Sequence, residues 1–262
     1  MSEQGVPLYD RFGREYDVMV SWPERLRREW PFLEARFRAA QARRVLDVGT
    51  GTGVHAIWFA QHGYQAVGTD PSPEMLRQAR LNAGDTSGVW FTQASLGEQA
   101  SVVGGRFDAV TCLGNTLPHA LTEAELLVAL RDLRSVLKSD GVLVVQLLNY
   151  DRILATGERF LGLSAGQEGP DEVLFFRFYD YPQSLESGCT LTFNVAIMRR
   201  TGSDWRWRVE STRLLPVRSD QLLRLLPAAG FGAITLFGGY AEEPFEPDRS
   251  NDLIVVARAE GA

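Results

Sequence analysis

The sequence predicts an α/β fold: a doubly wound, mostly parallel, seven-stranded Rossmann-like sheet that carries an inserted antiparallel β lid. Three observations predict it. Strand-like and helix-like segments alternate over residues 44–148, which is typical of a parallel sheet with crossover helices. Glycines follow the first strand at positions 49, 51 and 53 and lead directly into a helix. Residues 173–211 then hold consecutive strand patterns separated by turn residues, which favours an antiparallel meander.

Residues 1–43 are predicted to form a helical cap. The run from Leu8 to Asp17 is aromatic and polar, and we expect it to be helical in part. Ser21 followed by Pro23 is typical of a helix N-terminus, because proline fits the first helical turn. The helix that follows carries large apolar side chains at helical spacing, which predicts one buried face formed by Leu26, Trp30, Leu33 and Phe37.

Residues 44–149 are the predicted cofactor-binding core. Apolar and β-branched runs predict its parallel strands at residues 44–48, 65–70, 89–93, 107–113 and 141–148. Helices are expected between these strands, with starts at Ala56, at Ser72 or Pro73, and at the capping box that begins with Thr122. Ligands in such sheets bind at the carboxyl ends of the strands, so the residues that follow each strand are the candidates for a site.

Residues 150–216 break the alternation and are predicted to form the inserted lid. Its strand patterns cover residues 173–181, 189–198 and 205–211. Residues 217–262 are predicted to hold a helix and an edge hairpin; the helix begins at Ser219–Asp220, and the hairpin strands cover 233–237 and 253–257. No internal repeat or low-complexity linker separates these segments, so we expect a single domain over residues 1–262.

The composition narrows the classes of function. The 262-residue chain has a formal net charge of −6 at pH 7 and no long basic run, which argues against a nucleic-acid partner. No apolar run reaches the roughly 18 residues of a membrane span, and the N-terminus lacks a signal-peptide core. Two cysteines and three histidines, none of them clustered, argue against a disulfide framework and a metal site. We therefore expect a cytoplasmic monomer or homodimer that acts on a small molecule.

The glycine turn is the strongest signal for a ligand. A strand that turns through glycines into a helix exposes backbone N–H groups and the positive end of the helix dipole. The spacing from Asp47 to Gly53 is D-x-G-x-G-x-G, and the third glycine of the dinucleotide fingerprint would fall at Val54. An NAD-linked oxidoreductase is therefore the less favoured reading, and a turn that binds nothing is a further alternative. A carboxylate at Asp47 suits a ligand with an ammonium group better than a pyrophosphate.

Two later strand ends add candidates for binding a nucleoside. Asp70 ends the second strand about twenty residues after the turn, where a carboxylate can accept both hydroxyls of a ribose. The same residue could instead cap the following helix. Ser95 follows the third strand, where residues 93–96 would lie against an adenine, and a plain helix cap is the alternative there as well.

The spacing from Asp47 to Gly53 resembles motif I of the class I S-adenosylmethionine-dependent methyltransferases. The loops of residues 113–119 and 149–154 resemble those of small-molecule N-methyltransferases of the glycine/sarcosine type. The resemblance implies S-adenosyl-L-methionine as the cofactor and transfer of its methyl group to a small-molecule acceptor, at an amine nitrogen. An O-methyltransferase, an NAD-linked oxidoreductase and a non-catalytic cofactor-binding protein are the alternatives.

The resemblance also implies roles for individual residues around the cofactor. Leu113 would offer its carbonyl oxygen to the ammonium group of the cofactor, and Arg25 would hold its carboxylate. Tyr9 and Tyr16 would close over the sulfonium. A surface ion pair is the alternative for Arg25. The full set of predicted cofactor-binding residues is Tyr9, Tyr16, Arg25, Asp47, Gly49, Gly51, Gly53, Asp70, Met75, Ser95 and Leu113.

On the acceptor side, the resemblance implies that Asn115 and His119 are the catalytic residues, with His119 as the candidate general base. A capping or core histidine is the alternative for His119, and packing inside the lid is the alternative for the tyrosines. The predicted substrate pocket consists of Asn115, His119, Tyr150, Arg177, Tyr179 and Tyr240.

One position departs from the family pattern. Members that use glycine carry an arginine two residues before the tyrosine of the second loop, where it pairs with the substrate carboxylate; here that position is Leu148. A leucine cannot pair with a carboxylate. The sequence therefore favours an acceptor that is larger or less acidic than glycine. Arg177 in the lid is the candidate substitute for the missing arginine.

Overall fold

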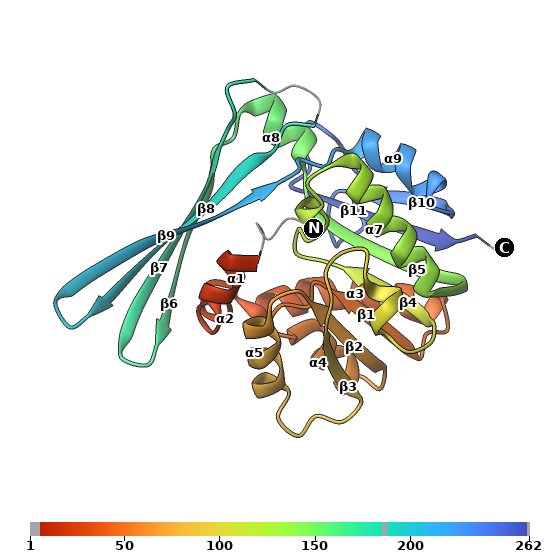
Figure 1. The fold of residues 1–262 in the computed structure, drawn as a ribbon, viewed down its shortest axis with the longest axis horizontal. Coiled ribbons are helices and arrows are strands. Elements are labelled where there is room, and N and C mark those ends of the chain that lie inside the picture. Colours follow the sequence, from red (N-terminus) through yellow and green to blue (C-terminus); the bar gives the residue numbers. More distant parts are fainter. Residues whose placement is uncertain (1–5, 185–187, 261–262) are drawn as a thin grey trace.

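The computed structural model describes residues 6–184 and 188–260. The strands of its larger sheet are Arg44–Val48 (β1), Gln65–Asp70 (β2), Val89–Gln93 (β3), Phe107–Cys112 (β4), Leu137–Leu148 (β5), Phe231–Phe237 (β10) and Asp252–Ala259 (β11). Their order is β10-β11-β5-β4-β1-β2-β3 (Figure 1). Strands β1 to β5 pair in parallel, whereas β11 runs antiparallel to both β5 and β10. The mostly parallel, seven-stranded sheet is therefore confirmed.

Packed helices cover both faces of this sheet. They are α3 (Trp22–Ala39) and α4 (Val54–Gln61) on one face, and α7 (Glu123–Val136) and α9 (Ser219–Ala228) on the other. Phe37 and Phe59 are fully buried under the first pair, and Leu130 and Leu226 under the second. Two further helices complete the core, α5 (Pro73–Ala83) beside α4 and α6 (Gln99–Val102) beside α7. Because both faces are covered, the sheet is doubly wound as predicted.

A separate antiparallel sheet forms the lid. It follows α8 (Tyr150–Thr156) and runs as a meander of β6 (Phe160–Glu168), β7 (Asp171–Asp180), β8 (Leu191–Thr201) and β9 (Asp204–Leu214). The sequence predicted only the last three strands. The missed strand β6 contains Gly162, Ser164 and Gly166, which have low strand propensity, and its pairing with β7 supplies what local preference lacks.

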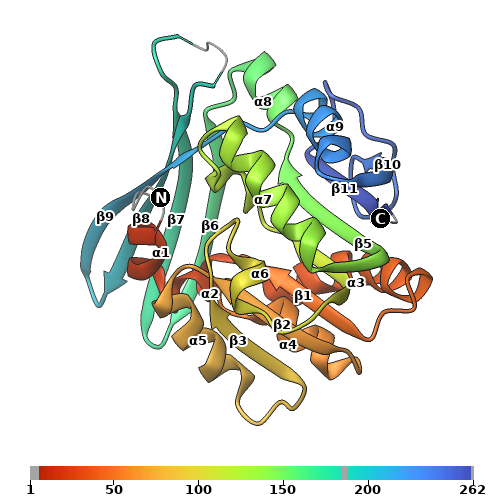
Figure 2. The same cartoon turned by 45° about the vertical axis from the view of Figure 1, so that its right-hand side comes forward.

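Two short helices at the N-terminus lie between the two sheets (Figures 1 and 2). They are α1 (Val6–Phe12) and α2 (Glu15–Met19), and they contact α5, β6, β7 and β9. Leu8 and Phe12 are buried against an apolar patch on the lid sheet formed by Val173, Phe175, Val195 and Ile197. We call the side of the lid sheet that meets α1 and α2 its inner face. None of the helices in the described part of the chain is both long and apolar enough to cross a membrane.

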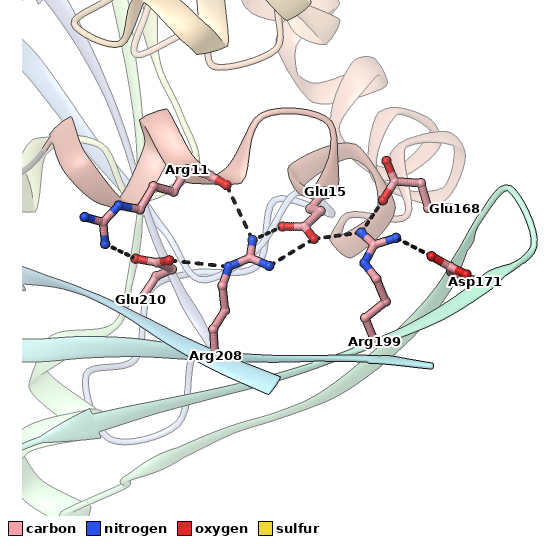
Figure 3. Close-up of polar contacts among 7 residues, drawn as sticks. All are labelled: Arg11, Glu15, Glu168, Asp171, Arg199, Arg208 and Glu210. Carbon is pink, nitrogen blue, oxygen red and sulfur yellow. Dashed lines mark hydrogen bonds and ion pairs between the residues drawn. The ribbon is translucent and has the colours of Figure 1, made fainter. Parts of the chain in front are cut away.

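A network of ion pairs also fastens α1 and α2 to the lid sheet (Figure 3). Glu15 of α2 lies at its centre and pairs with Arg199 of β8 and Arg208 of β9. The outer members of the network are Arg11 with Glu210, and Arg199 with Glu168 and Asp171. The Glu15 side chain is only 10% exposed, so the network is shielded more than an ordinary surface pair. The cap helices and the lid therefore pack as one unit over the carboxyl ends of the parallel strands.

Candidate active site

The glycine turn after β1 has the positive φ angles that explain its three glycines. Gly49, Gly51 and Gly53 have φ angles of +69°, +56° and +80°, a region that favours glycine. A Cβ on Gly53 would lie 2.7 Å from the ring of Phe91, and a Cβ on Gly49 would overlap Thr116. At Gly51 the nearest atom would be a ring carbon of Tyr16 at 3.7 Å, so that glycine faces open space. The turn can therefore bring its backbone close to a ligand.

Asp70 at the end of β2 is held beside this turn. One carboxylate oxygen accepts the Gly51 N–H and the other accepts the Ser72 N–H, each at 2.9 Å. Burial raises the pKa of Asp70 to about 6, although both backbone donors lower it. The cap of α5 is Ser72, whose hydroxyl accepts the Met75 N–H, so Asp70 is not the capping side chain of that helix. Its carboxylate lines a cavity instead.

Asp47 is placed differently from the expectation. Its two oxygens accept hydrogen bonds from the hydroxyls of Thr50 at 2.7 Å and Thr111 at 2.8 Å, and the side chain is buried. It lines neither of the two cavities described below. The carboxylate braces the glycine turn from beneath, and burial raises its pKa.

A first cavity of about 360 Å³ opens at the carboxyl ends of β1, β2 and β4. This volume is within the range of small-molecule sites. The predicted cofactor residues in its wall are Tyr9, Tyr16, Gly49, Gly51, Asp70, Met75, Ser95 and Leu113. Arg25, Asp47 and Gly53 lie outside it, because Gly53 packs on Phe91 and Asp47 is occupied by hydroxyls. The first cavity is also lined by Glu125 of α7 and Arg213 of β9, which were not predicted from the sequence.

A second cavity of about 470 Å³ lies between the N-terminal helices and the inner face of the lid sheet. It shares Tyr9, Tyr16 and Gly114 with the first cavity, so the two meet at these residues. Of the predicted substrate residues, Asn115, Arg177 and Tyr179 line it. Its remaining wall combines charged side chains, among them Arg25, Glu29 and Asp252, with apolar side chains that include Leu8, Phe12, Leu148, Leu161, Phe193 and Leu214.

His119 faces the first cavity and is absent from the wall of the second. It ends the short 3₁₀ helix η1 (Leu117–His119), and its Nε2 lies 2.9 Å from the Tyr9 hydroxyl. Burial lowers the pKa of His119 to about 4, so the ring is neutral at pH 7. The structure thus places it to hold Tyr9 rather than to meet an acceptor, which differs from the expected general base.

Asn115 lines the second cavity, but its amide is already engaged. Its Nδ2 donates to the Tyr150 hydroxyl at 2.8 Å, and its Oδ1 accepts the Leu148 N–H at 3.2 Å. Tyr150 is fully buried beneath the cavity, and burial raises its pKa to about 12. The Tyr150 hydroxyl lies 3.5 Å from that of Tyr179, which reaches the cavity wall. Asn115 and Tyr150 therefore fix the loop after β4 and the tyrosine of the lid.

Arg25 is mostly buried, which excludes the surface ion pair considered for it. Its Nε donates to Glu29 at 2.8 Å, and the second oxygen of Glu29 lies 2.7 Å from Nε2 of His55 on α4. The Arg25 side chain is 16% exposed, lines the second cavity and has its terminal nitrogens over Gly114. Glu29 and His55 were not predicted from the sequence. The signal for Glu29 was a carboxylate four residues after Arg25, on the face of α3 that also carries Phe32 and Leu33.

Tyr240 does not belong to either cavity. It is buried beside α3, with its ring 5.5 Å from the ring of Phe32 in a T-shaped arrangement. Within the described residues, its hydroxyl has no hydrogen-bond partner. Tyr240 therefore packs in the core beside α3, neither inside the lid nor in the substrate pocket to which the sequence assigned it. No cluster of three or more potential metal-ligating side chains occurs in the described residues.

Comparisons with known proteins agree with this geometry. A family model described as a methyltransferase domain matches residues 45–141. The glycine/sarcosine N-methyltransferase of Parasynechococcus marenigrum is 33% identical over 257 residues, which covers 94% of this chain and 86% of the relative. The enzyme of the same name from Aphanothece halophytica is 30% identical, with 94% and 88% covered. The chain belongs to the S-adenosylmethionine-dependent methyltransferases, in the group that contains these glycine/sarcosine N-methyltransferases.

Solved structures share the fold of this methyltransferase. CcbJ from Streptomyces caelestis superposes with a TM-score of 0.78 at 22% identity and covers 99% of this chain and 100% of its own. CalS10, an amino pentose methyltransferase from Micromonospora echinaspora, gives 0.68 at 21% identity, with 99% of both chains covered. The family membership decides against an NAD-linked oxidoreductase. S-adenosyl-L-methionine is the cofactor of this enzyme.

The first cavity fits this cofactor. Gly51 leaves open space where a side chain would stand, and the buried carboxylate of Asp70, which has spare lone pairs, lines the cavity. Free hydroxyls of a ribose would supply the donors that such a carboxylate lacks. The apolar remainder, which includes Met75 and Leu96, suits an adenine.

Proposed function

We propose that the enzyme methylates an amine nitrogen of a small molecule that binds in the second cavity. The observation that carries this proposal is the pair of cavities that meet at Tyr9, Tyr16 and Gly114. A cofactor in the first cavity would present its methyl group at that junction, and an acceptor in the second would approach from the lid side. Relatives named for N-methylation of glycine and sarcosine support nitrogen as the acceptor atom.

We infer the following cofactor contacts from the same geometry. Asp70 accepts the ribose hydroxyls, and Ser95 lies at the adenine end. Arg25, oriented by Glu29, binds the carboxylate of the methionyl part, because its terminal nitrogens lie over Gly114 where the cavities meet. The carbonyl oxygen of Leu113 accepts from the ammonium group.

The chemistry demands placement more than proton transfer. Bound S-adenosylmethionine supplies an already activated methyl group on its sulfonium. Correct placement of the nucleophile can lower the barrier by about 7–11 kcal/mol. Tyr9 and Tyr16 close the junction from the N-terminal cap, and the ion-pair network holds that cap on the lid. Neutral His119 keeps Tyr9 in position through the 2.9 Å hydrogen bond, so we assign it a positioning role.

A labelled-methyl assay tests the proposal. The enzyme is incubated with S-adenosylmethionine carrying an isotopically labelled methyl group and a cell metabolite extract, and products that gain the label are fragmented in a mass spectrometer. We expect the label on an amine nitrogen, and we expect its loss in Asp70→Ala but not in Glu34→Gln, whose residue pairs with Arg38 on α3 and lines neither cavity. Label found only on oxygen atoms, or no labelled product from an enzyme that binds S-adenosylhomocysteine, would contradict the proposal.

We also infer that the enzyme works as a single domain in the cytoplasm, as a monomer or homodimer, without a nucleic-acid partner. The net charge of −6 supports the last point. Light scattering after size exclusion measures the oligomeric state, and a filter-binding assay with DNA and RNA at low salt tests for nucleic-acid binding.

A further inference from the structure

Arg177 occupies an unusual place on the lid. It lies on β7 between Phe175 and Tyr179, and alternation along the strand puts all three on the inner face. Phe175 and Tyr179 are buried, and both Arg177 and Tyr179 line the second cavity. Across the sheet, Arg177 is in register with Val195 of β8. Arg177 therefore stands beside aromatic and apolar side chains of the lid, whereas the other arginines in the wall of this cavity, Arg25 and Arg28, both pair with Glu29.

The guanidinium of Arg177 has few partners within the protein. Its Nη2 donates to the carbonyl oxygen of Leu161 at 3.4 Å, a long contact. Its Nε is inaccessible to solvent and has no hydrogen-bond partner among the described residues. It forms no ion pair within residues 6–184 and 188–260. By contrast, Arg199 and Arg208, which lie farther along the same inner face, each pair with two or more carboxylates.

The acidic groups of the cavity do not compensate Arg177. Glu29 is engaged by Arg25 and His55, and Asp252 accepts a hydrogen bond from Gln146 at 2.8 Å. Glu24 is exposed on α3. Arg177 is partly buried, with its Nε shielded from solvent. A partly buried cation without a counter-charge is stabilised when an anion binds beside it.

We propose that Arg177 is the specificity-determining residue that binds a carboxylate of the methyl acceptor. This inference rests on the proposed function, because it names the class of acceptor for the same site. The acceptor is then an amino acid, with its amine at the junction near Tyr9 and Tyr16 and its carboxylate at the lid. A carboxylate fits better than a phosphate, because one guanidinium matches one negative charge and presents a planar fork to it.

The location of Arg177 also bears on the size of the acceptor. The end of β5 presents Leu148 to the cavity, which cannot bind an anion. Arg177 lines only the second cavity and contacts Leu161 of β6, so the anion subsite lies on the lid strands rather than at the end of β5. An acceptor whose amine and carboxylate are separated by several carbons spans this arrangement, whereas glycine is short.

The test uses matched pairs of acceptors. Straight-chain ω-amino acids of increasing length are compared with the alkylamines of the same length that lack the carboxylate, in methyl-transfer assays with the wild type, Arg177→Gln and Arg177→Lys. The control is Arg200→Gln, whose residue pairs with Glu172 on the opposite face of the lid sheet. Calorimetric titration with S-adenosylhomocysteine and a thermal unfolding curve accompany each variant.

We expect the wild type to prefer the amino acids over the matched amines by at least about tenfold in kcat/KM. Arg177→Gln should raise KM for the amino acids by about 10- to 100-fold while leaving their kcat, the amines and S-adenosylhomocysteine binding nearly unchanged. Arg177→Lys should restore part of the preference, and Arg200→Gln should change nothing.

Two results would overturn the inference while the proposed function stands. One is equal kcat/KM for amino acids and amines in the wild type. The other is an equal loss for both classes in Arg177→Gln. Failure to methylate any amine, in an enzyme that binds S-adenosylhomocysteine, would overturn the proposed function and this inference with it.

Discussion

The buried carboxylate of Asp70 gives the most quantitative prediction. With a pKa of about 6, it is about nine-tenths ionised at pH 7, half ionised at pH 6 and about one-tenth ionised at pH 5. Ribose hydroxyls donate to the ionised form. The dissociation constant of S-adenosylhomocysteine should therefore rise about twofold between pH 7 and pH 6, and about tenfold by pH 5. Isothermal titration calorimetry over this range measures it.

Replacing this side chain gives the matching variant. Asp70→Asn cannot ionise, and it turns one acceptor oxygen into a donor that faces a backbone N–H of Gly51 or Ser72. Loss of two charge-assisted hydrogen bonds, each contributing about 1.5–3 kcal/mol, should weaken binding by at least about 100-fold and make it independent of pH. Asp85→Asn, in an exposed loop, is the control and should behave as wild type. Wild-type affinity that is flat from pH 5 to pH 7, or unchanged affinity in Asp70→Asn, would refute the reasoning.

The raised pKa of Asp70 has the opposite effect on folding: lowering the pH weakens cofactor binding but stabilises the ligand-free protein. The pKa of Asp70 is raised in the native state above its ordinary value of 3.8, so the native protein favours the protonated form. Its contribution to the free energy of unfolding is therefore fully present below about pH 4 and is lost as the pH rises through about 6. The shift corresponds to roughly 3 kcal/mol. Relative to Asp70→Asn, the ligand-free wild type should gain up to this amount in urea titrations as the pH falls from 7 to 4.

Three further substitutions test the scaffold of the site. Gly53→Ala should lower the free energy of unfolding by about 2–4 kcal/mol, because the new Cβ would overlap the ring of Phe91. Gly63→Ala is the control: its φ is similar but its surroundings are open, so it should cost about 1 kcal/mol. Urea unfolding measures both. Glu29→Gln should cost about 3 kcal/mol and weaken S-adenosylhomocysteine binding in calorimetry, since it leaves a buried cation without its partner. Glu15→Gln should cost about 1–2 kcal/mol, and less at high salt. Glu34→Gln, the control, removes a single i,i+4 pair with Arg38 and should cost under about 0.5 kcal/mol. A cost for Glu15→Gln that does not depend on salt would count against the ion-pair network.

Local backbone chemistry made part of the site predictable from the sequence. The alternate glycines after β1 could be recognised because positive φ and close approach demand glycine. Asp70 could be placed because a strand end and a fixed chain distance define its position. Both depend on short stretches of sequence, and the structure puts Gly51 and Asp70 in contact at 2.9 Å.

Other features depend on residues that only the fold brings together. Glu29 and His55 lie on different helices, and nothing local pairs them. Asp47 was expected to bind a ligand, but its carboxylate oxygens accept hydrogen bonds from the hydroxyls of Thr50 and Thr111. Tyr240 was assigned to the pocket by its residue type, whereas its burial against α3 is a tertiary fact.

A structure of the enzyme with bound S-adenosylhomocysteine tests the central claim most directly. We predict the nucleoside in the first cavity, with both ribose hydroxyls within hydrogen-bond distance of Asp70 and the sulfur at the junction beside Tyr9 and Tyr16. Density for the nucleoside in the second cavity, or a ribose far from Asp70, would contradict the arrangement of donor and acceptor on which the account depends.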